Sequence, residues 1–113
     1  MAIDAAPHRG EVWLVSFDAA VGGEVQKTRP VVVLSNDTAN TLLNRVQVVP
    51  ISSQIGRLYP SEASVMVNGS RRKAMADQLT TASKRRLLRR VGVLSADDLD
   101  AVVRVVCVQL GIR

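Results

Sequence analysis

Arg29 stands directly before a proline and four apolar residues in the stretch GGEVQKTRPVVVLSN, residues 22–36. Pro30 restricts Arg29 to extended conformations, because the proline ring clashes with a helical preceding residue. A planar guanidinium held in this way donates two hydrogen bonds to phosphate oxygens and keeps its charge. Ser52, near the end of another predicted strand, offers a hydroxyl as a further donor. Together these groups suit the binding of a phosphodiester.

Metal ligands are scarce in this sequence, which has one histidine, His8, and one cysteine, Cys107. Without a His/Cys cluster at metal-ligand spacing, no metal and no other cofactor are predicted. Cleavage of a phosphodiester without a metal needs an internal nucleophile, and the 2′-OH of RNA supplies one. The alternative is that Arg29-Pro30 is an ordinary loop ending before a strand.

The net charge is +5, and the basic residues are concentrated between Arg71 and Arg90, where Asp77 alone opposes them. This distribution predicts a polyanionic partner, either a nucleic acid or an acidic protein, although charge runs are also typical of solvated surface. The N-terminus lacks a run of seven or more apolar residues, so neither a signal peptide nor a membrane anchor is expected. A single cysteine is compatible with the reducing cytoplasm, which is the predicted location.

The 113 residues are expected to form one domain, 1–113, with a flexible tail at residues 1–8. Short apolar runs and one terminal helix predict a mostly β fold with α, as a small curved antiparallel sheet or half-open barrel. Residues 18–29 are predicted to be a polar loop and 36–43 a short helix or structured connection. The predicted strands are 10–17, 31–35, 45–52 and 89–95, with a hairpin of 63–68 and 74–78 across GSRR.

A C-terminal helix is predicted after Ser95, a good N-cap residue that Asp98 follows in a capping-box pattern. Leu94 and Leu99 are placed to form the hydrophobic staple across this N-terminus. Apolar residues then mark one face of the helix at spacings of three, four and seven: Leu99, Val102, Val103, Val106 and Leu110.

The two strands that carry Arg29 and Ser52 are expected to pair antiparallel, so that the start of one lies beside the end of the other. A register in which Ser35 pairs with Val46 is assumed. It places Arg29 opposite Ser52, whereas a slip by one residue turns one of the two side chains to the other face. The polar loop before Arg29 then covers the pair.

Four blocks in order resemble the MazF/PemK family of toxin endoribonucleases over nearly the whole chain. They are RGEVWLVSFD (9–18), GGEVQKTRPVVVLSND (22–37), VVPISS (48–53) and AMADQLTT (74–81). The resemblance implies a CcdB/PemK/MazF-like fold, an SH3-like barrel of antiparallel strands with a C-terminal helix, acting as a homodimer. It further implies a type II toxin that cleaves single-stranded RNA at short sequences, without metal, leaving a 2′,3′-cyclic phosphate and a 5′-OH. An antitoxin with an acidic, partly disordered segment is implied as the inhibitor.

The resemblance also implies roles for individual residues. Arg29 matches the catalytic arginine of the family, Ser52 stands where the family most often has threonine, and Glu24 matches an acidic loop position. Arginine rarely gives up its proton, so Arg29 is interpreted as a phosphate clamp and Glu24 as the candidate general base. The predicted RNA-binding residues are Lys27, Ser53, Gln54, Tyr59 and the pair Asp77 and Gln78.

One position departs from the family pattern. Some members carry a second catalytic arginine two residues before the aspartate, and this chain has Met75 there. Arg72 and Lys73 are the two candidates to replace it. Two rival functions remain at this point, a non-enzymatic CcdB-like toxin that binds DNA gyrase and a basic module that binds nucleic acid without cleaving it.

Overall fold

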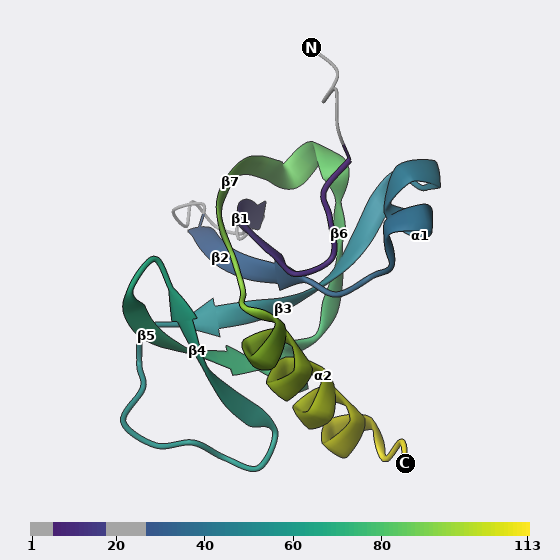
Figure 1. Cartoon of the computed structure of the whole chain (residues 1–113). Helices are drawn as coiled ribbons and strands as arrows, with labels where there is room; N and C mark the ends of the chain where they lie inside the picture. The colour runs from purple at the N-terminus through teal and green to yellow at the C-terminus, as the bar shows by residue number, and fades with distance from the viewer. Residues whose placement is uncertain (1–5, 18–26) are drawn as a thin grey trace, which may run out of the picture.

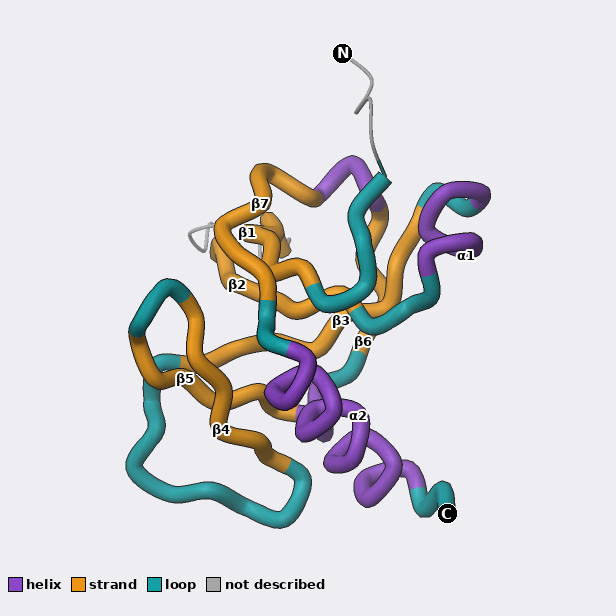
Figure 2. The backbone as a smooth tube through the Cα atoms, viewed as in Figure 1, coloured by secondary structure: helices purple, strands orange, loops and turns teal. Residues whose placement is uncertain are grey.

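Antiparallel strands form most of the molecule, and the C-terminal helix packs against them (Figures 1 and 2). This computed structural model describes residues 6–17 and 27–113. The strands within these ranges are β1 (Glu11–Phe17), β2 (Lys27–Val33), β3 (Arg45–Ser52), β4 (Glu62–Val67), β5 (Ser70–Met75), β6 (Thr80–Ser83) and β7 (Leu87–Val93). The α-helices are α1 (Asp37–Leu42) and α2 (Ala96–Leu110), and the 3₁₀ turns are η1 (Ala76–Gln78) and η2 (Lys84–Arg86).

The strand order is β4-β5-β3-β2-β1-β7, and β6 pairs with the first half of β3. β3 also carries Ile51 and Ser52 at its end, where it pairs with β5. Among the described strands, backbone pairing does not join β4 to β7. The side chain of Asn68 bridges this gap, because its Nδ2 donates to the carbonyl oxygen of Val91 on β7 at 2.7 Å. The mostly β, barrel-like fold with a C-terminal helix confirms the predicted fold class.

Both faces of β2 and β3 are buried, because an apolar cluster lies on either side of them. Val32 and Val49 belong to one cluster, which α2 covers with Val102. Val31 and Val48 belong to the other. All five side chains are fully buried. Strands buried on both faces have continuous apolar sequences, as the run that begins at Val31 has.

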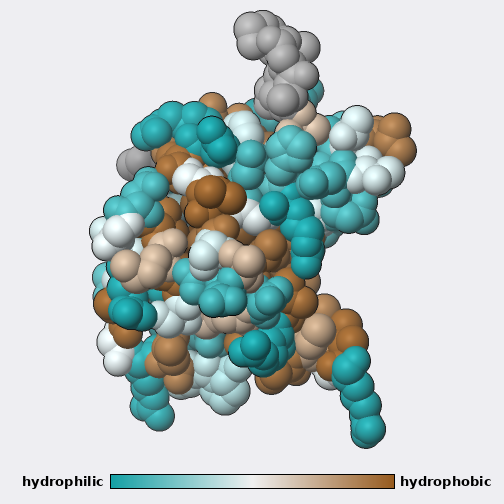
Figure 3. Space-filling model, viewed as in Figure 1, coloured by the Kyte–Doolittle hydropathy of each residue, from teal (hydrophilic) through white to brown (hydrophobic). Residues whose placement is uncertain are grey.

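The helix α2 begins after Ser95, as predicted. The Ser95 Oγ accepts a hydrogen bond from the backbone N–H of Asp98 at 3.1 Å, and Gly111 ends the helix at a φ of 70°. The Asp98 carboxylate does not complete a capping box; it accepts from the backbone N–H of Met66 at 2.9 Å and ties the helix to β4. Leu110 near the C-terminal end is 55% exposed, and apolar atoms show there at the lower right of Figure 3. No helix in the described part of the chain is long and apolar enough to cross a membrane.

The strand β2 begins earlier than predicted. Arg29 and Pro30 lie inside it, opposite Val15 and Leu14 of β1, rather than in a loop that precedes it. The proline is tolerated four residues into the strand because pairing with β3 begins only at Val31. The segment up to Pro30 is therefore an edge on that side, where a missing N–H donor is not needed.

The hairpin turn was misplaced by the prediction. It lies at Asn68-Gly69, whose φ angles of 51° and 81° fit a two-residue turn with left-handed residues, and not at GSRR. As a result β5 starts at Ser70, and residues 76–78 form η1 instead of the end of a strand. The strand β6 was not predicted. The final strand is Leu87–Val93 instead of 89–95, because Ser95 already caps α2.

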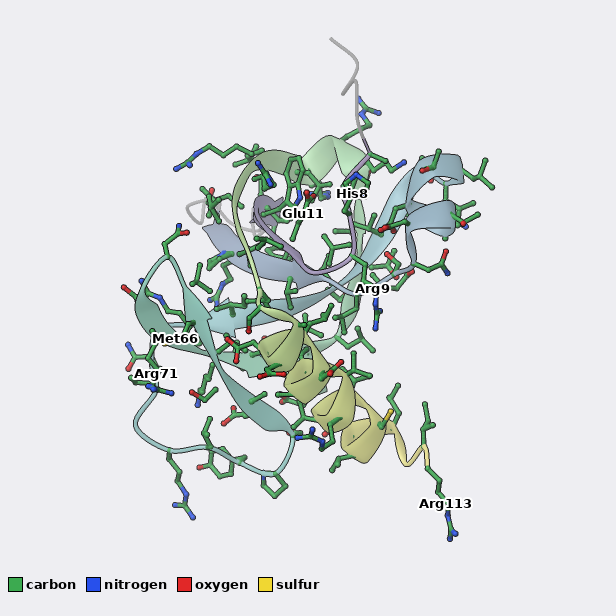
Figure 4. All side chains as sticks on the ribbon, viewed as in Figure 1. His8, Arg9, Glu11, Met66, Arg71 and Arg113 are labelled. Atoms are coloured by element: carbon green, nitrogen blue, oxygen red, sulfur yellow. The ribbon has the colours of Figure 1, made fainter. Side chains whose placement is uncertain are left out.

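Residues 6–8, which fall in the predicted tail, pack against the body of the domain. Pro7 is fully buried, and the backbone N–H of His8 donates to a Glu11 carboxylate oxygen at 2.8 Å. The His8 Nδ1 lies 3.4 Å from an Asp37 carboxylate oxygen. Figure 4 shows His8 and Glu11 close together where the described chain enters β1.

Candidate active site

Residues from β1, β2, β7, the end of β3 and the β4–β5 hairpin line a groove of about 580 Å³. Part of its lining is apolar, part consists of hydroxyl and amide groups, and the rest is cationic. No carboxylate occurs among the lining residues that the structure describes. The polar lining residues are Ser52, Ser53, Gln54, Asn68 and Ser70, and the cationic ones are Arg29, Arg72 and Arg89.

Arg29 and Ser52 reach this groove from neighbouring strands. Val31 lies opposite Pro50, and the same register continues through the next two pairs of β2 and β3. The register assumed from the sequence is therefore confirmed. Extended by two residues beyond Val31, it places Arg29 opposite Ser52, and both residues line the groove. Arg29 is exposed, so its guanidinium is available to a ligand.

Ser52 is the last residue of β3 and is half-buried. Its Oγ accepts a hydrogen bond from the backbone N–H of Gln54 at 3.0 Å. This bond fixes the position of the oxygen and leaves the hydroxyl hydrogen free to be donated to another group. The tight turn that it stabilises also brings Ser53 and Gln54 to the same groove, where both are exposed.

Arg72 and Lys73, the two candidates to replace the missing arginine, lie differently. Arg72 on β5 is half-buried and lines the groove. Lys73 does not; its Nζ lies 3.1 Å from a Glu62 carboxylate oxygen and 3.1 Å from the carbonyl oxygen of Arg57. Met75 is buried, 8% exposed. Of the two basic candidates, Arg72 is therefore the one that shares the groove with Arg29.

The Lys73–Glu62 pair is almost enclosed, with 11% and 9% of the two side chains exposed. Burial raises the pKa of Glu62, but the N–H of Tyr59 and the ammonium of Lys73 outweigh it and lower that pKa below its usual value. Glu62 also accepts from the backbone N–H of Tyr59 at 2.9 Å. The pair thus ties the loop between β3 and β4 to the hairpin.

The three arginines of the groove have no hydrogen bond or ion pair with any residue that the structure describes, whereas several basic residues outside it do. Arg71 Nη1 donates to the Ser64 hydroxyl at 2.6 Å. Arg90 Nη1 lies 3.7 Å from a Glu11 carboxylate oxygen. Guanidiniums that line one groove without a partner among the described residues repel each other, and an anionic ligand relieves that repulsion.

Three other predicted site residues, Tyr59, Asp77 and Gln78, do not line the groove. Tyr59 is 53% exposed on the β3–β4 loop, with the Arg57 guanidinium 5.1 Å from its ring centre. Asp77 and Gln78 are exposed in η1 and do not line the groove either. Lys27 begins β2, opposite Phe17. Glu24 lies outside the described residues.

Sequence reasoning left Asn68, Ser70 and Arg89 out of the site. The Asn-Gly pair at 68–69 is a strong hairpin signal and could have located the first two. Arg89 belongs to the basic run, but its direction depends on irregular pairing between β1 and β7, which shifts register between Leu14 and Val15. No pattern in the sequence predicts that shift. Within the described ranges, no group of three or more His, Cys, Asp or Glu residues is placed to hold a metal ion.

Comparison with known proteins gives consistent matches. Residues 8–110 match a family described as PemK-like, MazF-like toxin of type II toxin–antitoxin system. The chain is 40% identical over 100 residues to Endoribonuclease MazF9 of Mycobacterium tuberculosis, covering 80% of this chain and 85% of that protein. MazF from Deinococcus radiodurans has a TM-score of 0.81 at 26% identity, covering 96% of this chain and 100% of that one. A MazE–MazF structure from the same organism gives a TM-score of 0.78 at 26% identity, with coverages of 97% and 100%.

Proposed function

This chain belongs to the PemK-like, MazF-like toxins of type II toxin–antitoxin systems, and from that membership we propose that it is an endoribonuclease of single-stranded RNA. Cleavage at short sequences then inhibits translation and growth, and the site of action is the cytoplasm. The observation that carries the proposal is the shared groove of Arg29 and Ser52. A cationic groove without a carboxylate among its described lining residues matches a phosphodiester substrate.

In the proposed reaction the 2′-oxygen of RNA attacks the adjacent phosphorus while the bond to the 5′-oxygen breaks. The products are a 2′,3′-cyclic phosphate and a 5′-OH, and no metal is needed because the substrate supplies its own nucleophile. Negative charge builds on the non-bridging oxygens in the transition state. The guanidinium of Arg29 and the free hydroxyl hydrogen of Ser52 are the donors that meet this charge.

Two proton transfers complete the reaction. The 2′-OH loses a proton, and Glu24, three residues before the start of β2, is the proposed base. The 5′-oxygen gains a proton as it leaves, for which Arg29 is the candidate acid. Lys27, Ser53 and Gln54 are proposed to contact the RNA near the scissile phosphate. Tyr59, Asp77 and Gln78 lie outside the groove, and their proposed contacts are with nucleotides further along the strand.

Two protein partners are proposed. A cognate antitoxin blocks the groove with an acidic segment, since unpaired arginines attract carboxylates as well as phosphates. The family description and the MazE–MazF structure of the Deinococcus relative support this partner. A second copy of the chain is proposed to form a homodimer, supported by the exposed apolar side chains near the end of α2, among them Val108 and Leu110. Light scattering that finds a monomer of about 12.2 kDa at micromolar concentration would exclude the dimer.

The decisive test is incubation of the purified protein with mixed single-stranded RNA in the presence of EDTA, followed by sequencing of the new 5′ ends. Discrete 5′-OH ends at a recurrent short sequence are expected. An oligonucleotide with deoxyribose at the mapped site should resist cleavage, because it lacks the nucleophile. Salt-sensitive binding without products would instead identify a basic binding module. Neither binding nor cleavage would leave the CcdB-like alternative.

A further inference from the structure

Arg72 and Arg89 place more positive charge in the groove than one phosphodiester can use. A scissile phosphodiester carries one negative charge and two non-bridging oxygens. The bidentate guanidinium of Arg29 and the hydroxyl of Ser52 already supply enough donors for these oxygens. Two further guanidiniums, without a partner among the described residues, remain in the same groove. A second anionic group, in addition to the scissile phosphate, would balance the charge of these two guanidiniums.

The size of the groove agrees with this count. Its volume of about 580 Å³ lies within the range of pockets that hold a whole small ligand. The apolar part of the lining includes Leu14, Ile51 and Val91, which suits a sugar or base better than a bare phosphate. The space therefore accommodates a nucleotide together with a phosphate beyond the scissile one.

The fold also holds the two arginines in fixed relation to each other. Arg72 lies three residues after Gly69 in the hairpin, and Arg89 lies on β7. The hydrogen bond from Asn68 to the Val91 carbonyl joins the hairpin tip to β7 at 2.7 Å, close to both. Two backbone segments that are tied together therefore carry the guanidiniums, and the side chains themselves are ordered when the phosphate binds.

We propose that Arg72 and Arg89 form a second phosphate-binding subsite, which holds the RNA backbone phosphate next to the scissile one. This inference rests on the proposed function and names how the same groove recognises its substrate. The subsite binds the RNA equally well in the ground state and in the transition state. Its loss therefore raises KM and leaves kcat nearly unchanged. It contacts backbone and not bases, so its loss weakens binding uniformly across sequences.

The chain supplies matched controls for this subsite. Arg71 and Arg90 are the sequence neighbours of Arg72 and Arg89, and each carries the same charge. Both are engaged outside the groove, Arg71 with Ser64 and Arg90 with Glu11. Figure 4 shows Arg71 at the outer side of the β4–β5 hairpin. Within each pair of neighbours, either substitution changes the net charge by the same amount. Only the substitution of Arg72 or Arg89 removes a guanidinium from the groove.

The experiment measures kcat and KM on a labelled oligonucleotide at several salt concentrations for Arg72→Gln, Arg89→Gln, Arg71→Gln and Arg90→Gln. The two groove variants should each raise KM about tenfold and lower the slope of log affinity against log salt by about 0.7. The two controls should stay within about twofold of wild type, as expected for screened surface charge. Equal effects in the groove and control variants would show diffuse attraction and overturn the subsite. A fall in kcat with unchanged KM would overturn it as well, by placing these arginines on the scissile phosphate.

A neutral methylphosphonate at the adjacent phosphate gives an independent check. When it replaces the phosphate on one particular side of the scissile phosphate, binding to the wild type should weaken. The same replacement should not weaken binding to Arg72→Gln any further. Arg72 is half-buried, so Arg72→Lys, which keeps the charge, serves if Arg72→Gln does not fold. If the wild type cleaves no RNA, the proposed function fails. The subsite is then judged on binding of the deoxy oligonucleotide, where Arg72→Gln must bind more weakly than Arg71→Gln.

Discussion

Replacing Lys73 with methionine should destabilise the fold without removing a group from the groove. The substitution leaves Glu62 as an almost enclosed carboxylate that has lost the ammonium 3.1 Å away. Removing one partner of a buried ion pair costs about 3–5 kcal/mol of unfolding free energy. Each side chain keeps about a tenth of its surface in water, so we expect the lower end, about 3 kcal/mol.

This cost converts into a melting temperature. An unfolding entropy of about 2.1 cal/mol/K per residue, over 113 residues, corresponds to about 4 °C per kcal/mol. Lys73→Met should therefore melt about 12 °C below wild type at neutral pH, measured by circular dichroism at one fixed protein concentration. The double variant Lys73→Met with Glu62→Gln should recover much of the loss, because neither charge is then left unpaired.

The pH dependence of the stability of Lys73→Met tests the same ion pair. The pKa of Glu62 is lowered in the folded protein, so its contribution to stability is present above the ordinary carboxyl range. That contribution is lost as the pH falls through the pKa of Glu62 in the folded protein, which lies below the ordinary glutamate value. The difference between wild type and Lys73→Met should therefore shrink as the pH is lowered from 7 towards 3. A difference below about 3 °C at pH 7 would mean that the pair behaves as an exposed one, and the reasoning would be refuted.

Three further outcomes are expected. Arg29→Ala should reduce RNA cleavage by about a hundredfold or more with an unchanged melting temperature, since its side chain is exposed, and Ser52→Ala should reduce cleavage less because it removes a neutral donor. Near-normal cleavage by folded Arg29→Ala would contradict the mechanism. Asn68→Ala should lower the unfolding free energy by about 1–3 kcal/mol in urea titration, through the lost bond to Val91 and a left-handed alanine. Ser95→Ala should cost about 1 kcal/mol in the same assay, through the lost helix cap, and no change would mean that water replaces the cap.

The position of Arg29 near Ser52 could be predicted because adjacent antiparallel strands bring the start of one beside the end of the other. From the sequence alone the exact register is an assumption, because Val31 and Val32 are both buried, in opposite clusters, and a slip of one residue would exchange valines between the clusters without exposing a face to water. The start of α2 could be predicted for a different reason, since the hydroxyl of Ser95 satisfies a helix N–H locally. For the helix, the interaction that decides its start therefore lies within a few residues of it.

The hairpin turn was misplaced and β6 was not predicted, and the two errors have opposite causes. The sequence contains the signal for the hairpin turn, Asn68-Gly69, but the glycine was assigned to a longer turn that includes the arginines after it. That error removed Arg72 from a strand and hid the side to which it points. Residues 80–83, in contrast, have a polar sequence with only Ala82 deeply buried, and they form a strand because β3 offers an unpaired edge. Such tertiary pairing leaves no periodicity to detect.

The fold divides the basic run of residues 71–90 into two populations. A charge count treats Arg71 and Arg72 alike, and Arg89 and Arg90 alike. In the structure one member of each pair contacts a neighbouring side chain outside the groove, and the other faces the groove. On both β5 and β7 the strand alternation makes this division, because consecutive side chains of a strand point to opposite faces. Arginines whose only role was solubility would be stabilised by partners such as Ser64 or Glu11. The ones without a partner among the described residues are those that face the groove, which is the arrangement expected when a polyanionic substrate supplies the missing charge.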